Sequence, residues 1–117
     1  PGLVKWLHEN NKFEQATDAQ ALLPLAAHYL LEAKHRTGQP LDPVARFHLN
    51  NGAFVEAVHA DADISANGMA QSCGVMVNYR YDLNKISTNH EAYANHQSVV
   101  ASKAVRALAD QAQTADA

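Results

Sequence analysis

The feature that most constrains the fold is a run of alternating residues at positions 75–81. One face of this run carries Val75, Val77, Tyr79 and Tyr81, and the other carries Met76, Asn78 and Arg80. A period of two predicts a half-buried β-strand. A second, more polar strand is predicted from Phe54 to about Ala60. Because two strands alone make a marginally stable sheet, we expect them to join strands that lie outside this chain.

Helical patterns before the strands predict an α+β fold. Residues 2–8 are predicted to form the end of a helix, which terminates at the turn-forming pair Asn10-Asn11. A long helix is predicted from Leu23 to Arg36, with Pro24 in its first turn and an apolar stripe at helical spacing. The basic residues 34–36 would then occupy its last turn, where cations suit the helix dipole.

Two further helices are predicted from their first residues. Asp42 and Pro43 are typical of a cap and a first helical position, so a short helix or turn is expected at 42–47. Thr88 and Glu91 have the spacing of a capping box, which predicts a last helix that begins near Thr88 and includes the apolar positions up to Ala112.

Composition excludes several classes of protein. The chain has 117 residues and a formal net charge of −3, with no cluster of Lys and Arg, which argues against binding of nucleic acid. The single cysteine excludes an internal disulfide framework, and no apolar run approaches the about 20 residues that a membrane span needs.

We expect a bacterial cytoplasmic protein, with a mitochondrial or peroxisomal homologue as the alternative. Because the chain opens at Pro1 without a methionine, we also expect it to be part of a longer protein.

Three stretches of the sequence resemble a known family. They are residues 27–36 (AHYLLEAKHR), 41–53 (LDPVARFHLNNGA) and 72–81 (SCGVMVNYRY). In this order and spacing they resemble the C-terminal region of the malonyl-CoA decarboxylases. The second stretch is the most specific, because it is long and mixes proline, histidine, asparagine and glycine. The first twenty residues and the last helix match the family only in character.

The resemblance implies an enzyme that converts malonyl-CoA into acetyl-CoA and carbon dioxide without a cofactor. It implies a catalytic domain like the GNAT acetyltransferase fold, of which residues 1–117 would be the C-terminal half, with two to three strands and flanking helices. The family's N-terminal helical domain and the first half of the catalytic domain would lie outside this chain. The expected partners are malonyl-CoA, the remainder of the same enzyme and further copies of it in a homo-oligomer.

The resemblance also implies particular site residues. The family's catalytic pair is a serine and a histidine; the histidine falls on His48, and the serine lies upstream of the matched region. The second tyrosine of the Asn-Tyr-x-Tyr string lines the family's active site and falls on Tyr81. Position alone suggests Asn51 and Gly52 as further hydrogen-bond donors to substrate. No metal ligand is expected.

The chemistry suits these residue types. Loss of carbon dioxide leaves an enolate on the thioester, whose own carbonyl accepts the electrons, so preorganised donors and a proton source are what the protein must supply. A histidine, with an ordinary pKa of about 6.5, holds and releases a proton near neutral pH. Tyr81 is a candidate to donate a hydrogen bond to the carboxylate or to His48.

Other readings of the same residues stay open. A GNAT-type acyl-CoA-dependent acyltransferase is one, although its Gly-rich phosphate loop is not visible. A non-catalytic CoA-binding or oligomerisation module is another. A metal-dependent oxygenase is a third, because His59, Asp61 and Asp63 would share a face if their strand continued. Cys73 is predicted to be a small buried residue, not a reactive thiol. Tyr79 and Tyr81 are core aromatics in the plainest reading.

Overall fold

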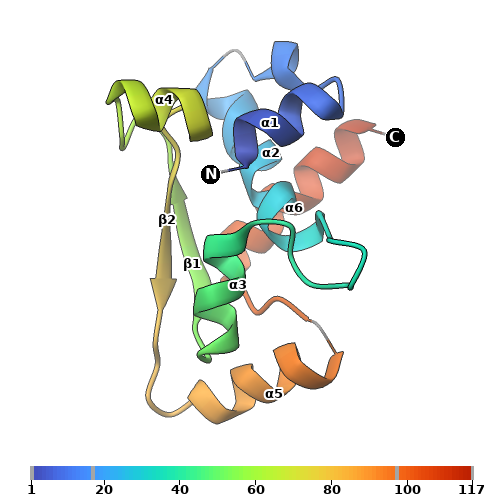
Figure 1. Cartoon of the computed structure of the whole chain (residues 1–117), viewed down its shortest axis with the longest axis vertical. Coiled ribbons are helices and arrows are strands. Elements are labelled where there is room, and N and C mark those ends of the chain that lie inside the picture. Colours follow the sequence, from blue (N-terminus) through green and yellow to red (C-terminus); the bar gives the residue numbers. More distant parts are fainter. Residues whose placement is uncertain (1, 17, 97, 117) are drawn as a thin grey trace.

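The computed structural model of the chain describes residues 2–16, 18–96 and 98–116. Within these residues it contains six α-helices, one short 3-10 helix and two strands (Figure 1). In chain order the elements are α1 (Leu3–Glu9), η1 (Phe13–Gln15), α2 (Ala19–Glu32), α3 (Pro43–Asn50), β1 (Phe54–His59), α4 (Ala66–Ser72), β2 (Met76–Arg80), α5 (Ile86–His96) and α6 (Lys103–Asp116). The α+β class is therefore confirmed, while the GNAT-like arrangement stays a prediction.

The two predicted strands pair with each other. β1 and β2 form an antiparallel sheet in which Val55 lies opposite Tyr79 and Val58 opposite Val77, with an irregular register between Val55 and Ala57. Along β2 the even-numbered residues are exposed and the odd-numbered ones half-buried, so the predicted alternation is confirmed. The other edge of β1 is partly covered too, because Val55 forms a parallel bridge with Ala101.

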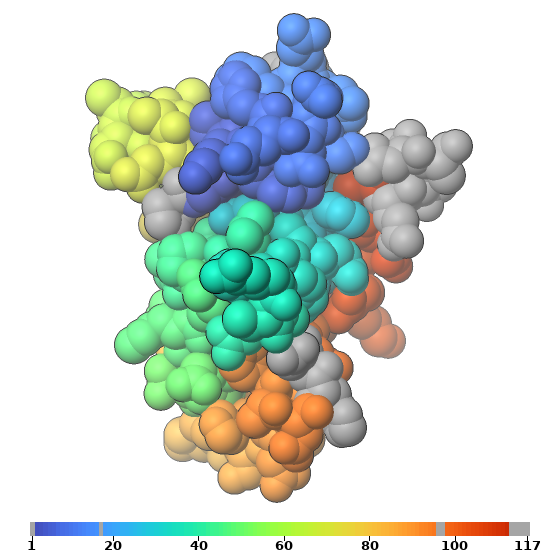
Figure 2. All heavy atoms as spheres, turned by 45° about the vertical axis from the view of Figure 1, so that its right-hand side comes forward, coloured from blue at the N-terminus to red at the C-terminus, as the bar shows by residue number. Residues whose placement is uncertain are grey.

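The helices lie along one side of this hairpin. Figure 1 shows α4 at one end of the hairpin and α5 at the opposite end, with α3 beside the strands and α6 behind α2. Figure 2 shows the same order on the surface, where α4 projects beside α1 and α5 forms the far end. The core joins helices and sheet, and its largest fully buried side chains include Leu7, Tyr29, Leu49, Val55 and Val105. None of the helices in the described residues is long and apolar enough to span a bilayer.

The prediction for the second helix was wrong at both ends. α2 begins four residues earlier than expected, because the Asp18 carboxylate accepts a hydrogen bond from the Ala21 N–H and caps it. Pro24 consequently lies in the second turn. The helix stops at Glu32, and the basic residues 34–36 follow it in a turn in which the His35 N–H donates to the Gln39 carbonyl. The expected stripe is nevertheless buried, from Leu22 to Leu30.

The predicted last helix is two helices. α5 starts at Ile86, so Thr88 lies inside it and the predicted capping box is wrong. The chain then leaves the helical path and runs beside β1, where the Val55 N–H donates to the Val100 carbonyl and the Ser102 N–H donates to the Val55 carbonyl. Ser102 also caps α6, since its hydroxyl accepts from the Val105 N–H.

A further helix, α4, was not predicted at all. Ser65 caps it by accepting from the Gly68 N–H, and the Asp63 carboxylate accepts from both the N–H and the hydroxyl of Ser65. β1 ends at His59, and Asp61 has a left-handed backbone with φ of 53°. The expectation that His59, Asp61 and Asp63 share the face of one strand is therefore wrong.

Candidate functional site

α3 presents His48 in its last turn and is anchored at its start by Asp42. The Asp42 carboxylate accepts hydrogen bonds of 3.0 Å from the N–H groups of Val44 and Ala45, and Pro43 is the first helical residue. The predicted cap is thus confirmed. Ala45 and Leu49 are buried on the inner side of α3, which fixes the helix against the core and leaves His48 partly exposed on another side.

His48 lies against both tyrosines of the predicted strand. Its Nδ1 atom is 2.7 Å from the Tyr81 hydroxyl oxygen, a short hydrogen bond between groups 33 positions apart in sequence. Its ring stacks on Tyr79 with a centroid separation of 4.3 Å and an interplanar angle of 16°. The alternation that puts both tyrosines on one face of the predicted strand therefore brings them to the same histidine.

The contact with Tyr81 leaves the opposite edge of the imidazole available. When Nδ1 is unprotonated, the Tyr81 O–H donates to it; when the ring is protonated, the Nδ1–H donates to the Tyr81 oxygen. None of the residues that the structure describes forms a hydrogen bond with Nε2 of His48. The site can therefore transfer a proton at Nε2 while Tyr81 holds Nδ1.

Tyr79 is the more enclosed of the two tyrosines. Burial raises the pKa of its hydroxyl above the ordinary range, and the negative charge of Asp42 raises it further. Tyr79 consequently stays neutral near physiological pH and places no charge next to His48. Tyr81 follows the end of β2 and is 42% exposed, so it can meet a molecule that arrives from solvent.

Asn51 and Gly52 form the turn that ends α3. The Asn51 side chain donates to the Phe47 carbonyl at 2.8 Å, and the Gly52 N–H donates to the Leu49 carbonyl at 3.0 Å. Gly52 has φ of 88° and is buried against Ile86 of α5. The Gly52 N–H is thus used within the turn, whereas the Asn51 amide has a second N–H. The role of both residues in binding stays a prediction.

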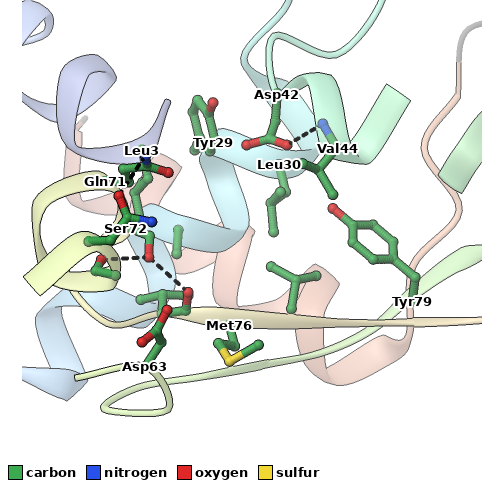
Figure 3. A pocket seen from close by; sticks show the side chains of 15 residues that line it. Leu3, Tyr29, Leu30, Asp42, Val44, Asp63, Gln71, Ser72, Met76 and Tyr79 are labelled. Atoms are coloured by element: carbon green, nitrogen blue, oxygen red, sulfur yellow. Dashed lines mark hydrogen bonds between the residues drawn. The ribbon is translucent and has the colours of Figure 1, made fainter. Parts of the chain in front are cut away.

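A cavity of about 350 Å³ lies on the other side of Tyr79, between β2, α2, α4 and the start of α3. Figure 3 shows the Tyr79 side chain at one wall with its hydroxyl directed inward, and Tyr29 beside Asp42 at another wall. Burial raises the pKa of Tyr29, and the negative charge of Asp42 adds to the increase. Asp42 thus links the cap of α3 to both tyrosines.

The remaining candidates lie away from His48 in the hydrogen-bond network. His59 contacts the Asn78 side chain through Nε2 at 3.2 Å. Cys73 is half-buried after α4 rather than fully buried, and burial raises the pKa of its thiol. Within the described residues no group of three His, Cys, Asp or Glu side chains is arranged to hold a metal ion.

Sequence reasoning underestimated two residues. The plainest reading makes Tyr79 a core aromatic, yet its ring lies flat on the histidine. Asp42 was identified as a cap, but not as a charge next to Tyr29 and Tyr79. The strand alternation contained the signal for Tyr79, whereas nothing local indicated the proximity of Asp42 to the tyrosines.

Comparison with known proteins gives a consistent result. The family model described as the malonyl-CoA decarboxylase C-terminal domain matches residues 3–117. The chain is 41% identical over 106 residues to the mitochondrial malonyl-CoA decarboxylase of Rattus norvegicus, and 45% identical over 92 residues to that of Anser anser anser. These matches cover 91% and 79% of this chain, and 21% and 18% of the relatives. The chain therefore spans about a fifth of the length of these curated relatives.

Solved structures match equally well. The malonyl-CoA decarboxylase of Rhodopseudomonas palustris superposes with a TM-score of 0.84 at 40% identity, covering 92% of this chain and 31% of that one. The malonyl-CoA decarboxylase of Agrobacterium vitis superposes with a TM-score of 0.82 at 36% identity, covering 92% of this chain and 33% of that one.

Proposed function

The chain belongs to the malonyl-CoA decarboxylase family, and from this premise we propose that it supplies His48 to the conversion of malonyl-CoA into acetyl-CoA and carbon dioxide. The observation that carries the proposal is the 2.7 Å contact between His48 Nδ1 and the Tyr81 hydroxyl. His48 is partly exposed, and no described residue forms a hydrogen bond with its Nε2 atom. His48 acts as the proton donor to the enolate carbon.

The reaction balances with these groups. The bond between the α-carbon and the carboxylate breaks, its electron pair moves into the thioester carbonyl to form an enolate, and carbon dioxide leaves. The Nε2–H bond of the His48 imidazolium then breaks as the electron pair returns from the enolate to form the new C–H bond. Nδ1–H keeps its hydrogen bond to the Tyr81 oxygen, and solvent restores the proton to Nε2. The thioester serves as electron sink, which supports a reaction without a cofactor.

Tyr81 has two roles in this proposal. It fixes Nδ1, so that proton exchange occurs at Nε2, and its exposed side chain contacts the substrate. Asn51 is proposed as a second substrate contact, because its side chain is exposed next to the end of α3. Gly52 is a weaker candidate, because it is buried and its N–H is already bonded to Leu49.

The chain would act together with the remainder of the same enzyme. We propose that a segment outside residues 1–117 supplies the serine that binds the departing carboxylate, and that this segment extends the α+β architecture toward a GNAT-like domain. A homo-oligomer and a cytoplasmic location stay predictions. The family membership supports the decarboxylase over an acyltransferase or a non-catalytic CoA-binding module.

The test is an assay of acetyl-CoA formation from malonyl-CoA, using the complete protein that contains this chain. We expect His48→Ala to lower turnover by at least about 10²-fold, the scale of general acid catalysis. His59→Ala is the matched control, because His59 is exposed and contacts Asn78 instead of the two tyrosines. A wild-type protein without activity, or a fully active His48→Ala variant, would overturn the proposal.

A further inference from the structure

Tyr79 makes a contact with His48 that its position on a strand does not require. The two rings are nearly parallel, at 16°, with centroids 4.3 Å apart, whereas Phe47 meets the same imidazole edge-on at 84° and 5.2 Å. Parallel stacking restricts the rotation of the histidine side chain, because turning the imidazole would drive its edge into the tyrosine ring. One full face of the imidazole is therefore covered.

The Tyr79 ring is itself held from several sides. Its backbone lies opposite Val55, which is fully buried, and its side chain is half-buried and packs against the core. Its hydroxyl points into the cavity that Asp42 and Tyr29 also line (Figure 3). A tyrosine whose backbone is paired and whose ring packs against the core is a rigid platform for a neighbouring side chain.

The contacts around His48 then leave one direction for proton transfer. Tyr79 covers one face, the Tyr81 hydroxyl takes Nδ1, and the Phe47 ring lies perpendicular to the imidazole. Because Nδ1 is bonded to Tyr81, Nε2 is the ring nitrogen that remains to transfer a proton to a substrate. A proton can be delivered accurately only if the plane of the imidazole is fixed, since misalignment of a catalytic group costs rate.

We propose that Tyr79 is a positioning residue for His48: its ring sets the imidazole plane so that Nδ1 meets Tyr81 and Nε2 faces the substrate. The inference rests on the proposed function of His48 as proton donor, and it assigns Tyr79 no contact with the substrate. It predicts that the aromatic ring, and not the hydroxyl, is what the site requires.

The kinetic test compares three variants of the complete protein. Tyr79→Leu removes the stacked ring, Tyr79→Phe keeps it, and Val77→Ala trims a residue on the same face of β2 as a control for packing. We expect Tyr79→Leu to lower kcat by about three- to tenfold, the size of one aromatic contact, with a smaller change in KM. Tyr79→Phe and Val77→Ala should keep kcat within about twofold of wild type.

The second measurement observes His48 directly. Nitrogen-15 labelling of histidine gives NMR signals for both ring nitrogens, and the His48 signals are those lost in His48→Gln. For the neutral imidazole, we expect wild type and Tyr79→Phe to show a single tautomer with the proton on Nε2, and Tyr79→Leu to show averaging between the two tautomers.

The outcomes separate this inference from the proposed function. If wild type does not decarboxylate malonyl-CoA, the proposed function fails, while the NMR comparison still decides whether Tyr79 fixes the ring. If Tyr79→Leu matches Val77→Ala in kcat and leaves the His48 signals unchanged, Tyr79 is only a core residue. If Tyr79→Phe loses as much activity as Tyr79→Leu, the hydroxyl acts instead of the ring, and the proposal is wrong.

Discussion

Asn89 of α5 donates a side-chain hydrogen bond of 3.3 Å to the carbonyl oxygen of Gly52, in the turn that follows His48. Asn89 is only 5% exposed, so its side-chain amide is buried. The hydrogen bond to Gly52 gives this buried amide a partner. α5 thus supports the end of α3 from a segment 37 positions away, and the geometry of the turn affects the placement of the histidine.

Gly52→Ala should destabilise the fold strongly. A Cβ atom at Gly52 would lie 2.7 Å from Ile86 Cγ2 and 2.8 Å from the Ile86 carbonyl oxygen, at a φ of 88° that L-residues disfavour. We expect a loss of at least about 3 kcal/mol in the free energy of unfolding, measured by urea denaturation. Gly38→Ala is the control, because Gly38 shares the φ of 88° in a surface turn and should lose about 1 kcal/mol. Equal losses would show that Ile86 does not oppose the added methyl group.

Tyr81→Phe should lower turnover by about tenfold, because it removes one hydrogen bond to a ring that carries charge during the reaction. The measurement is kcat for acetyl-CoA formation. Tyr93→Phe is the control, because it removes the hydroxyl of a buried tyrosine in α5 instead of one that contacts His48. Combined with His48→Ala, the substitution should cause no further loss, since the two residues act as a unit. An additive loss in the double variant would separate Tyr81 from His48.

Asp42→Ala should destabilise α3. The variant loses two hydrogen bonds at the helix start, which costs about 1–2 kcal/mol in thermal or urea unfolding. Asp18→Ala removes the cap of α2 at an exposed position and is expected to cost less. Loss of the Asp42 charge should also lower the pKa of Tyr79, because that charge raises it in the wild-type protein. An unchanged Tyr79 pKa would place the carboxylate too far away to act.

Stability should fall in alkaline solution above about pH 10, the ordinary pKa of tyrosine. Burial raises the pKa of Tyr29, Tyr79 and Tyr93 in the folded state, so the unfolded chain releases those protons first. The folded state then binds more protons than the unfolded one, and the free energy of unfolding decreases as pH rises. Thermal melts across this pH range measure the effect, and Tyr79→Phe should make the decrease shallower. A Tm that is independent of pH above 10 would contradict it.

Local patterns in the sequence predicted what local interactions decide. Asp42 caps α3 because a carboxylate at that position reaches two N–H groups within three residues. The alternation along β2 survives because one face of the hairpin meets the helices. His48 and Tyr81, by contrast, were singled out through family resemblance, since no local rule relates residues 33 positions apart.

The errors arose where distant backbone decides the conformation. Residues 98–102 interrupt the helical pattern between α5 and α6 because Val55 offers them hydrogen bonds from across the molecule. Thr88 and Glu91 have the residue types and spacing of a capping box, but they lie inside a helix that starts at Ile86. Stacking of Tyr79 on His48 likewise depends on how α3 meets β2, which periodicity alone does not report.

The double pairing of Val55 has a kinetic consequence. On one side this residue lies opposite Tyr79, and on the other its N–H and carbonyl bond to Val100 and Ser102, while the Ser102 hydroxyl reaches the Glu56 carbonyl from 46 positions away. Contacts between residues so far apart require closure of a long loop before they stabilise the chain, so they form slowly and late. The hairpin and α6 should therefore consolidate in one cooperative step after the main folding barrier, and substitutions at Val55 should accelerate unfolding more than they slow refolding.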